Sequence, residues 1–342
     1  MPFPLLQIEN ATTMTFGGGL LSGAPAVVAL EGFNLDLHEH PARITAIAGE
    51  SGSGKTTLAH LVLGFLHPTR GRILYRGVNL ADMDRTERLA YRKDVQAIFQ
   101  DPYEVFNPFF RVHHTFDLVT RCFLKTESRT ETRAAVEEAL RRVGLRGEEI
   151  LEKYPHQLSG GQRQRVMMAR AALVQPRLIV TDEPVSAVDA SLRASILDLM
   201  RRMRDENGIS FLYITHDLST AYQIGDRMAG LFRGVTVEEG DARALIEQPR
   251  HPYVRELIGS IPVPDPKTRW NTTVELPADE DRVRSASGCR YYSRCAQRMD
   301  VCLSVSPRLV PVAPDHAVAC HLYVDNLGVN GRPIPFSSKD TL

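Results

Sequence analysis

The segment from Gly49 to Thr56 constrains this chain more than any other, because it reads GESGSGKT and fits the pattern G-x-x-x-x-G-K-[ST]. The apolar residues before it predict a buried strand over residues 42–48, and the residues after it predict a helix over residues 57–65. Between a strand and a helix, such a loop can point successive backbone N–H groups inward at phosphate groups. The alternative, a Gly/Ser turn that happens to precede a lysine, is disfavoured by this setting. The segment therefore predicts a nucleoside triphosphate site.

Each part of this loop has an expected role. Lys55 is expected to reach the β- and γ-phosphates, and the hydroxyl of Thr56 is expected to hold Mg²⁺. The candidate nucleotide-binding residues of this segment are Gly49, Glu50, Ser51, Gly52, Ser53, Gly54, Lys55, Thr56 and Thr57.

Length and charge bound what else the chain can be. Its 342 residues suffice for roughly two domains, and 41 basic residues balance 41 acidic ones. Because the charges cancel, no overall field attracts nucleic acid or an anionic membrane surface. The chain begins without a basic region or a signal-like apolar core, and no apolar run approaches the ~18 residues of a membrane span. We therefore expect a soluble, cytoplasmic chain.

The order of the expected elements indicates an α/β fold. Two antiparallel strands, over residues 5–9 and 29–37, come first, and further strands are expected over residues 71–77 and 95–99. A helical insert is expected over about residues 101–157, and parallel-type strands return over residues 178–180 and 209–214. Prolines between residues 249 and 266 indicate the exit from this core. We place the boundary near Leu257, between a domain over residues 1–257 and an extension over residues 258–342.

A second candidate phosphate-binding segment begins a later helix. Ser159, Gly160, Gly161 and Gln162 precede an amphipathic run with Val166, Ala169 and Leu173 on one side. Backbone N–H groups at a helix N-terminus attract anions. One chain rarely needs two such sites for one γ-phosphate, so the pair of segments indicates two chains arranged head to tail. The alternative is a solvent-exposed turn that caps the helix.

Two acidic residues follow a buried strand. Residues 178–180 are apolar, and Asp182 and Glu183 come just after them. Asp182 is expected to hold Mg²⁺ at the end of the strand, and Glu183 to polarise the attacking water. Two surface charges are the alternative, but a surface strand would alternate apolar and polar residues.

Taken together, these motifs resemble those of the ATP-binding cassette family over roughly the first three quarters of the chain. The resemblance implies a P-loop NTPase fold of this family's type, with an antiparallel β-subdomain at its N-terminus. It implies that Gln100 touches Mg²⁺ and nucleotide and senses a membrane partner, and that His216 contacts the γ-phosphate. It places Asp189 in the loop called the D-loop, which begins at Ser186. Phe16 is the candidate that stacks on adenine, with a core phenylalanine as the alternative.

The family also implies a mechanism. Two chains enclose two ATP molecules, each held by one chain's loop at residues 49–56 and the other chain's segment at residues 159–162. ATP binding closes the pair and hydrolysis opens it.

Two further segments resemble the oligopeptide/dipeptide importer ATPases. They are residues 251–257, HPYVREL, with the proline-rich residues 261–266, and residues 154–157, YPHQ. This resemblance implies a second ATPase subunit (identical or a paralogue), two membrane permease subunits and an extracytoplasmic binding protein, with this chain on the cytoplasmic face of the inner membrane and no nucleic acid partner. A nickel chelate or oligosaccharide as cargo, or a non-transport cassette ATPase, are the alternatives. Residues 101–110, with three phenylalanines, are either a docking surface for the membrane subunit or part of the core of the insert.

Four cysteines crowd into the last part of the chain: Cys289, Cys295, Cys302 and Cys320. In a cytoplasmic protein such thiols favour a metal over disulfides, but the paired C-x2-C spacing of zinc sites is missing and the spacing does not name the metal. The resemblance to the importer ATPases implies a [4Fe–4S] cluster, with Zn²⁺ or unligated thiols as alternatives. Cys122 stands apart and is expected to pack as a small hydrophobe.

Overall fold

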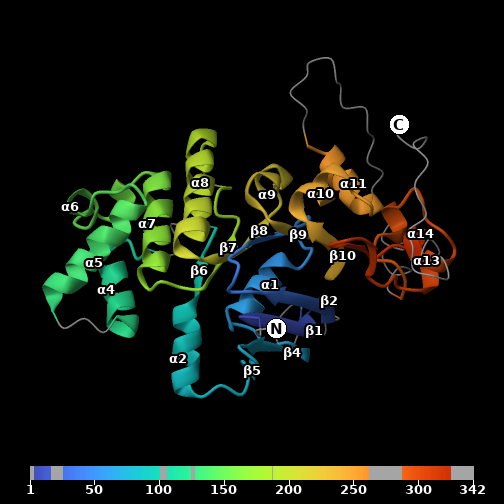
Figure 1. The fold of residues 1–342 in the computed structure, drawn as a ribbon, viewed down its shortest axis with the longest axis horizontal. Coiled ribbons are helices and arrows are strands. Elements are labelled where there is room, and N and C mark those ends of the chain that lie inside the picture. Colours follow the sequence, from blue (N-terminus) through green and yellow to red (C-terminus); the bar gives the residue numbers. More distant parts are fainter. Residues whose placement is uncertain are drawn as a thin grey trace, which may run out of the picture.

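The computed structural model describes residues 4–16, 26–100, 106–124, 128–186, 188–261 and 287–324, and these residues form two sheets with helices around them (Figure 1). The smaller sheet has four strands in the order β2-β1-β4-β5, and all its pairs are antiparallel. The strands are β1 (Leu6–Phe16), β2 (Ala26–Leu37), β4 (Arg70–Tyr75) and β5 (Val78–Asn79). The expected antiparallel pair at the N-terminus is confirmed, and both of its strands are longer than the apolar runs that predicted them.

The larger sheet has eight strands in the order β11-β12-β10-β9-β3-β8-β7-β6. From β9 to β6 neighbouring strands are parallel, and the strands beyond β9 are antiparallel. The parallel strands are β3 (Ile44–Ala48), β6 (Val95–Ile98), β7 (Leu178–Asp182), β8 (Ser210–Thr215) and β9 (Arg227–Phe232); β10 (Val235–Asp241) turns back beside β9. All residues of β3 and β8 are buried, as expected for strands covered on both faces.

Both faces of the larger sheet are covered, so the core has two parts. The alternation of side chains along β3 shows this, because Ile47 belongs to one buried cluster while Ile44 and Ala46 belong to the other. The cluster that contains Ile47 lies between the two sheets, around α1 (Lys55–Val62). On the other face pack the long helix α8 (Ala190–Asn207), α9 (Leu218–Ile224) and the helical insert; α2 (Arg85–Asp94) precedes β6.

The helical insert stands at one end of the molecule (Figure 1). Its described elements are α4 (Val112–Phe123), α5 (Arg129–Arg142), α6 (Gly147–Ile150) and the 3₁₀ turn η1 (Pro155–Gln157), followed by α7 (Gly160–Leu173). Ser128 caps α5 by accepting a hydrogen bond from the backbone N–H of Glu131 at 3.2 Å. The prediction that Cys122 packs in a core is wrong: it is exposed, because the buried face of α4 carries Val112, Phe116 and Thr120 instead.

The C-terminal module, residues 287–324, lies at the opposite end (Figure 1). It contains the 3₁₀ turn η2 (Tyr292–Arg294), α13 (Val301–Ser304), β11 (Val310–Ala313), β12 (His316–Val318) and α14 (His321–Val324). Before it, α10 (Ala242–Glu247) and α11 (Pro252–Gly259) close the cassette. Because β12 pairs with β10, the module extends the larger sheet, and the expected boundary near Leu257 falls inside α11.

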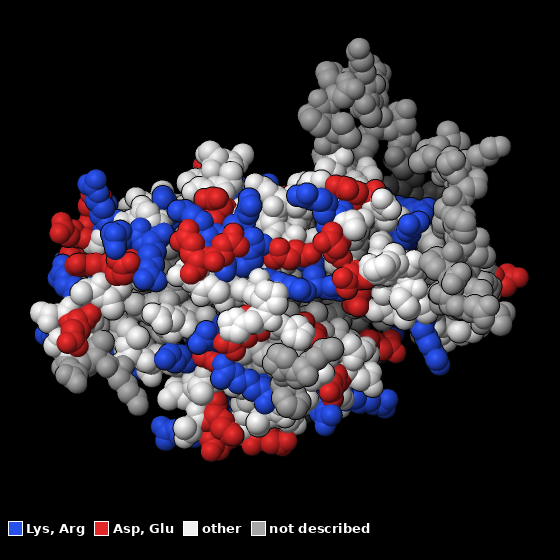
Figure 2. All heavy atoms as spheres, viewed as in Figure 1, with Lys and Arg blue, Asp and Glu red and all other residues white. Residues whose placement is uncertain are grey.

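The surface agrees with the balanced composition. Basic and acidic side chains alternate over the face shown in Figure 2, without a broad area of one sign. None of the helices in the described residues has the length and apolar character needed to cross a membrane.

Candidate nucleotide-binding site

The loop at residues 49–54 joins β3 to α1, as the sequence predicts, and close contacts require two of its glycines. Gly54 has φ of +106°, and a Cβ atom there would lie 2.4 Å from the carbonyl oxygen of Ala29. A Cβ atom on Gly49 would lie 2.2 Å from the carbonyl oxygen of Leu231. Backbone packed this tightly excludes any side chain at either position. The backbones of β2 and β9 therefore pack directly against this loop.

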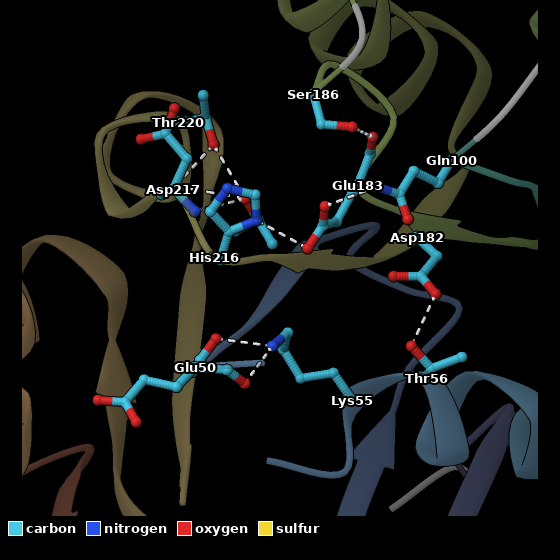
Figure 3. Close-up of polar contacts among 12 residues, drawn as sticks. Glu50, Lys55, Thr56, Gln100, Asp182, Glu183, Ser186, His216, Asp217 and Thr220 are labelled. Atoms are coloured by element: carbon cyan, nitrogen blue, oxygen red, sulfur yellow. Dashed lines mark hydrogen bonds and ion pairs between the residues drawn. The ribbon is translucent and has the colours of Figure 1, made fainter. Parts of the chain in front are cut away.

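Lys55, the first residue of α1, folds back over this loop. Its Nζ donates hydrogen bonds to the carbonyl oxygens of Gly49 at 2.6 Å and Glu50 at 2.7 Å (Figure 3). The side chain is buried, and burial lowers the pKa of the amine, while the carboxylates of Glu183, Asp182 and Glu50 oppose that shift. The Lys55 amine is thus held within the loop by two carbonyl oxygens, which the oxygens of an incoming phosphate can replace.

Thr56 and Asp182 face each other across the gap between α1 and β7. The Thr56 hydroxyl donates a hydrogen bond of 3.2 Å to Oδ2 of Asp182, the last residue of β7 (Figure 3). Burial raises the pKa of Asp182, the neighbouring Glu183 adds to that effect, and the bond from Thr56 and the charge of Lys55 oppose it. A hydroxyl and a carboxylate are hard oxygen donors, the ligand type that Mg²⁺ prefers.

Glu183 stands between two polar side chains. Its Oε1 lies 2.7 Å from Nδ1 of His216, and its Oε2 accepts a hydrogen bond of 3.1 Å from Nε2 of Gln100 (Figure 3). The three residues follow β6, β7 and β8, which are neighbours in the larger sheet, so their side chains meet where those parallel strands end. A cavity of about 540 Å³ opens beside them.

The backbone of Glu183 is held in an unusual conformation. Its φ is +47°, in the left-handed region that a residue with a side chain rarely adopts. Its N–H donates to the carbonyl oxygen of Ile214 at 2.9 Å, and its own carbonyl accepts hydrogen bonds from the Ser186 hydroxyl and N–H at 3.0 and 3.2 Å. Strain of this kind, held by surrounding contacts, is typical of functional sites.

The segment at residues 159–162 is placed apart from the phosphate loop. Ser159 Oγ accepts from the Gln162 N–H at 3.2 Å, and Gln162 Oε1 accepts from the Ser159 N–H at 3.0 Å, so the two residues form a capping box at the start of α7. Among the residues that the structure describes, no hydrogen bond joins this segment to residues 49–54. Figure 1 shows α7 among the helices at one end, whereas α1 lies against both sheets. One chain therefore does not bring the two predicted anion sites together.

Within the part of the chain that the structure describes, neither Asp189 nor the candidate docking surface is hydrogen-bonded to the nucleotide-binding residues described above. Asp189 is the N-cap residue of α8, is exposed and makes no side-chain capping bond. Ala187 in the same loop lies outside the described residues, as does the side chain of Phe16, the candidate for adenine stacking. Phe106 is buried, whereas Phe109 and Phe110 are exposed.

The four cysteines of the C-terminal module do not form the expected ligand set. Cys302 and Cys320 are buried, and the Cys289 N–H donates to the carbonyl of Cys302 at 2.8 Å. Burial raises the pKa of the Cys289 thiol to about 11 and of the Cys320 thiol to about 12, and the other cysteines add to both shifts. Within the described ranges, no group of three or more His, Cys, Asp and Glu side chains is arranged to hold a metal ion. The structure of the described residues therefore does not support the predicted cluster.

One contact at the phosphate loop could not be predicted from the sequence. Arg294, in the C-terminal module, forms a two-pronged ion pair with Glu50, and the Tyr253 hydroxyl accepts the Glu50 N–H at 2.9 Å. Tyr253 lies in residues 251–257, for which the sequence predicts a resemblance to importer ATPases but no role at the nucleotide site. Arg294 is 244 positions from Glu50.

Comparison with known families agrees with these motifs. The model of the ABC transporter family matches residues 30–186, and that of the oligopeptide/dipeptide transporter C-terminal region matches residues 237–302. The oligopeptide transport ATP-binding protein OppF of Escherichia coli is 36% identical over 87% of this chain and 89% of its own length. The dipeptide transport ATP-binding protein DppF of Haemophilus influenzae is 34% identical over 88% of this chain and 91% of its own length.

A solved structure agrees as well. The ATP-binding cassette MJ0796, described as a dimer in a post-hydrolysis state bound to ADP and Pi, is 27% identical, with a TM-score of 0.60 over 70% of this chain and 99% of its own length.

Proposed function

Since this chain belongs to the ABC transporter family, in its oligopeptide/dipeptide transport group, we propose that it is the ATPase subunit that drives peptide uptake through a membrane importer. The observation that carries the ATPase part is the meeting of Glu183 with Gln100 and His216 at the ends of adjacent parallel strands, opposite Lys55. The match of residues 237–302 to the transporter C-terminal region carries the peptide part.

Phosphoryl transfer to water needs little covalent work from the protein, and depends on charge neutralisation and an aligned nucleophile. The backbone of residues 49–54 binds the phosphates, and Lys55 exchanges its carbonyl partners for phosphate oxygens. Thr56, Asp182 and Gln100 would hold Mg²⁺, which neutralises phosphate charge when bound. Glu183 orients the attacking water and takes its proton. His216 and Gln100 hold the Glu183 carboxylate in place, and Phe16 stacks on adenine.

We place the second half of the site in another chain. Because residues 159–162 stand apart from the phosphate loop of their own chain, a head-to-tail pair is the arrangement that lets them contact a bound triphosphate. ATP then closes the pair and hydrolysis releases it. The partners are a second ATPase subunit, identical or a paralogue, two permease subunits and an extracytoplasmic substrate-binding protein, and this chain lies at the cytoplasmic face of the inner membrane.

The variant Glu183→Gln tests this function. It keeps a polar side chain between Gln100 and His216 but cannot accept a proton, so it should bind ATP while hydrolysis falls by at least about 100-fold. It should also accumulate a dimer in ATP, visible by size-exclusion chromatography with light scattering. Glu206→Gln, which changes an exposed acid on α8, is the matched control and should behave as wild type. Hydrolysis at the wild-type rate in Glu183→Gln would rule out this role.

As a finer part of this function, we propose that the cysteines at 289, 295, 302 and 320 bind a [4Fe–4S] cluster, with Zn²⁺ as the alternative. The proposal is supported by the gathering of the four thiols in one module, where the Cys289 N–H donates to the carbonyl oxygen of Cys302. It requires the module to adjust, since the described thiols form no ligand set. Anaerobic purification followed by metal analysis and a visible spectrum tests it: a coloured, iron-loaded protein supports the cluster, whereas a colourless protein with zinc or no metal excludes it.

A further inference from the structure

The phosphate loop is contacted by a charged side chain from the far end of the sequence. Arg294 lies in the C-terminal module, and its Nη1 and Nη2 each donate a hydrogen bond of 2.8 Å to one carboxylate oxygen of Glu50. Glu50 is the second residue of the phosphate loop. This two-pronged geometry is the strong and directional form of an arginine–carboxylate pair. The module therefore holds the loop directly.

The guanidinium group of Arg294 is itself fixed on its other sides. Its Nη2 also donates to Glu256 Oε1 at 2.5 Å, and Glu256 in turn accepts a hydrogen bond from the Tyr291 hydroxyl. The group lies 5.6 Å from the centre of the Tyr291 ring and 5.8 Å from that of Phe232. Only 18% of the side chain is exposed. An arginine placed between two carboxylates and two rings has little freedom to leave Glu50.

Glu50 is restrained through its backbone as well. Its N–H donates to the Tyr253 hydroxyl at 2.9 Å, and its carbonyl accepts from Lys55 Nζ at 2.7 Å. Its side chain extends away from Lys55 (Figure 3). The carboxylate nevertheless belongs to the loop that is to receive a triphosphate, and an unpaired negative charge there would repel the phosphates.

We propose that Arg294 is a positioning residue of the phosphate loop, which sets the affinity for nucleoside triphosphate by neutralising and orienting Glu50. This inference rests on the proposed function. Arg294 makes no hydrogen bond or ion pair with Glu183, Gln100 or His216 among the described residues, so it acts on nucleotide binding and leaves the hydrolytic step unchanged. The C-terminal module thereby becomes part of the nucleotide site.

The test measures binding of MgATP to the purified full-length chain in a double-mutant cycle. Arg294→Ala should weaken binding by about tenfold, because Glu50 is left unpaired near the phosphates. In a Glu50→Gln background the same change should have less than about a twofold effect, because no carboxylate remains to be neutralised. Arg294→Lys keeps the charge but loses the two-pronged geometry, and should weaken binding by about threefold. Arg290→Ala is the matched control in the same module, since Arg290 pairs with Glu31 instead, and it should bind as wild type.

Steady-state kinetics separates positioning from a general loss of structure. Arg294→Ala should raise KM for ATP and keep kcat within about twofold, with the unfolding temperature monitored for every variant. An equal loss of affinity in both backgrounds, an unchanged affinity in Arg294→Ala, or a fall in kcat at unchanged KM would each overturn the proposal. A wild-type chain that neither binds nor hydrolyses ATP would instead refute the proposed function, so the two failures are distinguishable.

Discussion

At the scale of single residues, His251 shows how burial can fix a protonation state. Its side chain is 1% exposed, its Nδ1 accepts the Tyr253 N–H at 3.1 Å, and its own N–H donates to the buried carboxylate of Glu238. Burial lowers the pKa of His251 to about 3, and the charge of Arg255 contributes to the shift. The imidazole is therefore neutral in the folded protein and caps α11 as an acceptor.

This depressed pKa predicts acid sensitivity. In the unfolded chain a histidine has a pKa of about 6.5, so below that pH the unfolded state binds more protons and folding stability falls as pH drops toward 3. Between pH 7.5 and pH 5 this group should lower the free energy of unfolding by about 2 kcal/mol. His251→Asn keeps a capping acceptor but does not titrate, so its free energy of unfolding, measured in urea, should fall less over that range. His67→Asn, at an exposed position, should retain the full loss. An equal loss in wild type and His251→Asn would contradict this account.

Some residues of the candidate site can be recognised from a short sequence motif, whereas others come together only through contacts between distant segments. Lys55, Thr56 and Glu183 could be predicted because each lies in a short motif beside an expected strand or helix. The pairing of Arg294 with Glu50 could not be predicted, because it joins segments 244 positions apart and neither residue stands out from its neighbours. Such contacts depend on the packing of the whole chain rather than on local pattern.

At the scale of elements, the phenylalanines at the start of the helical insert differ in burial. The sequence alone does not show which of them are buried and which are exposed. Phe106 is 4% exposed and joins the main core, whereas Phe109 is 86% exposed. Residues 106–110 precede α4 and form no regular element, so no periodicity could distinguish core from surface positions. The exposed phenylalanines are consistent with a docking surface, and the buried one with a structural role.

Charging the exposed position should separate coupling from hydrolysis. In Phe109→Asp the basal ATPase rate and the free energy of unfolding should stay close to wild type, within about 0.5 kcal/mol for stability, because the side chain contributes to no core. Peptide uptake by cells that carry this variant should be lost if the membrane subunit docks here. Phe106→Ala is the contrasting control and should lower stability by about 3 to 5 kcal/mol. A matched fall of ATPase and uptake in Phe109→Asp would show that the residue supports the fold instead.

At the scale of the whole molecule, the C-terminal module is tied into the cassette through a buried contact between a histidine and a carboxylate. Its strand β12 pairs with β10, and His316 Nε2 of the module lies 2.7 Å from Oε1 of Glu238 in β10. Glu238 is fully buried and also accepts the N–H groups of Arg250 and His251, at 2.8 Å each. A sequence boundary drawn from the proline-rich segment could not show this, because strand pairing between distant segments leaves little local trace.

If the module and the cassette share one cooperative structure, removing the partner of Glu238 should destabilise both. His316→Ala leaves a buried carboxylate with only its backbone donors, and should lower the free energy of unfolding by about 2 to 3 kcal/mol. Hydrogen exchange should speed up in β12 and in β10 together, because the two strands are hydrogen-bonded neighbours. Asp315→Asn, which weakens an exposed ion pair with Arg227 next to the same position, should cost less than about 0.5 kcal/mol. Faster hydrogen exchange confined to the module, with β10 unchanged, would mean that the module opens by itself. The contact of Arg294 with the phosphate loop could then break and form again while the cassette stays folded.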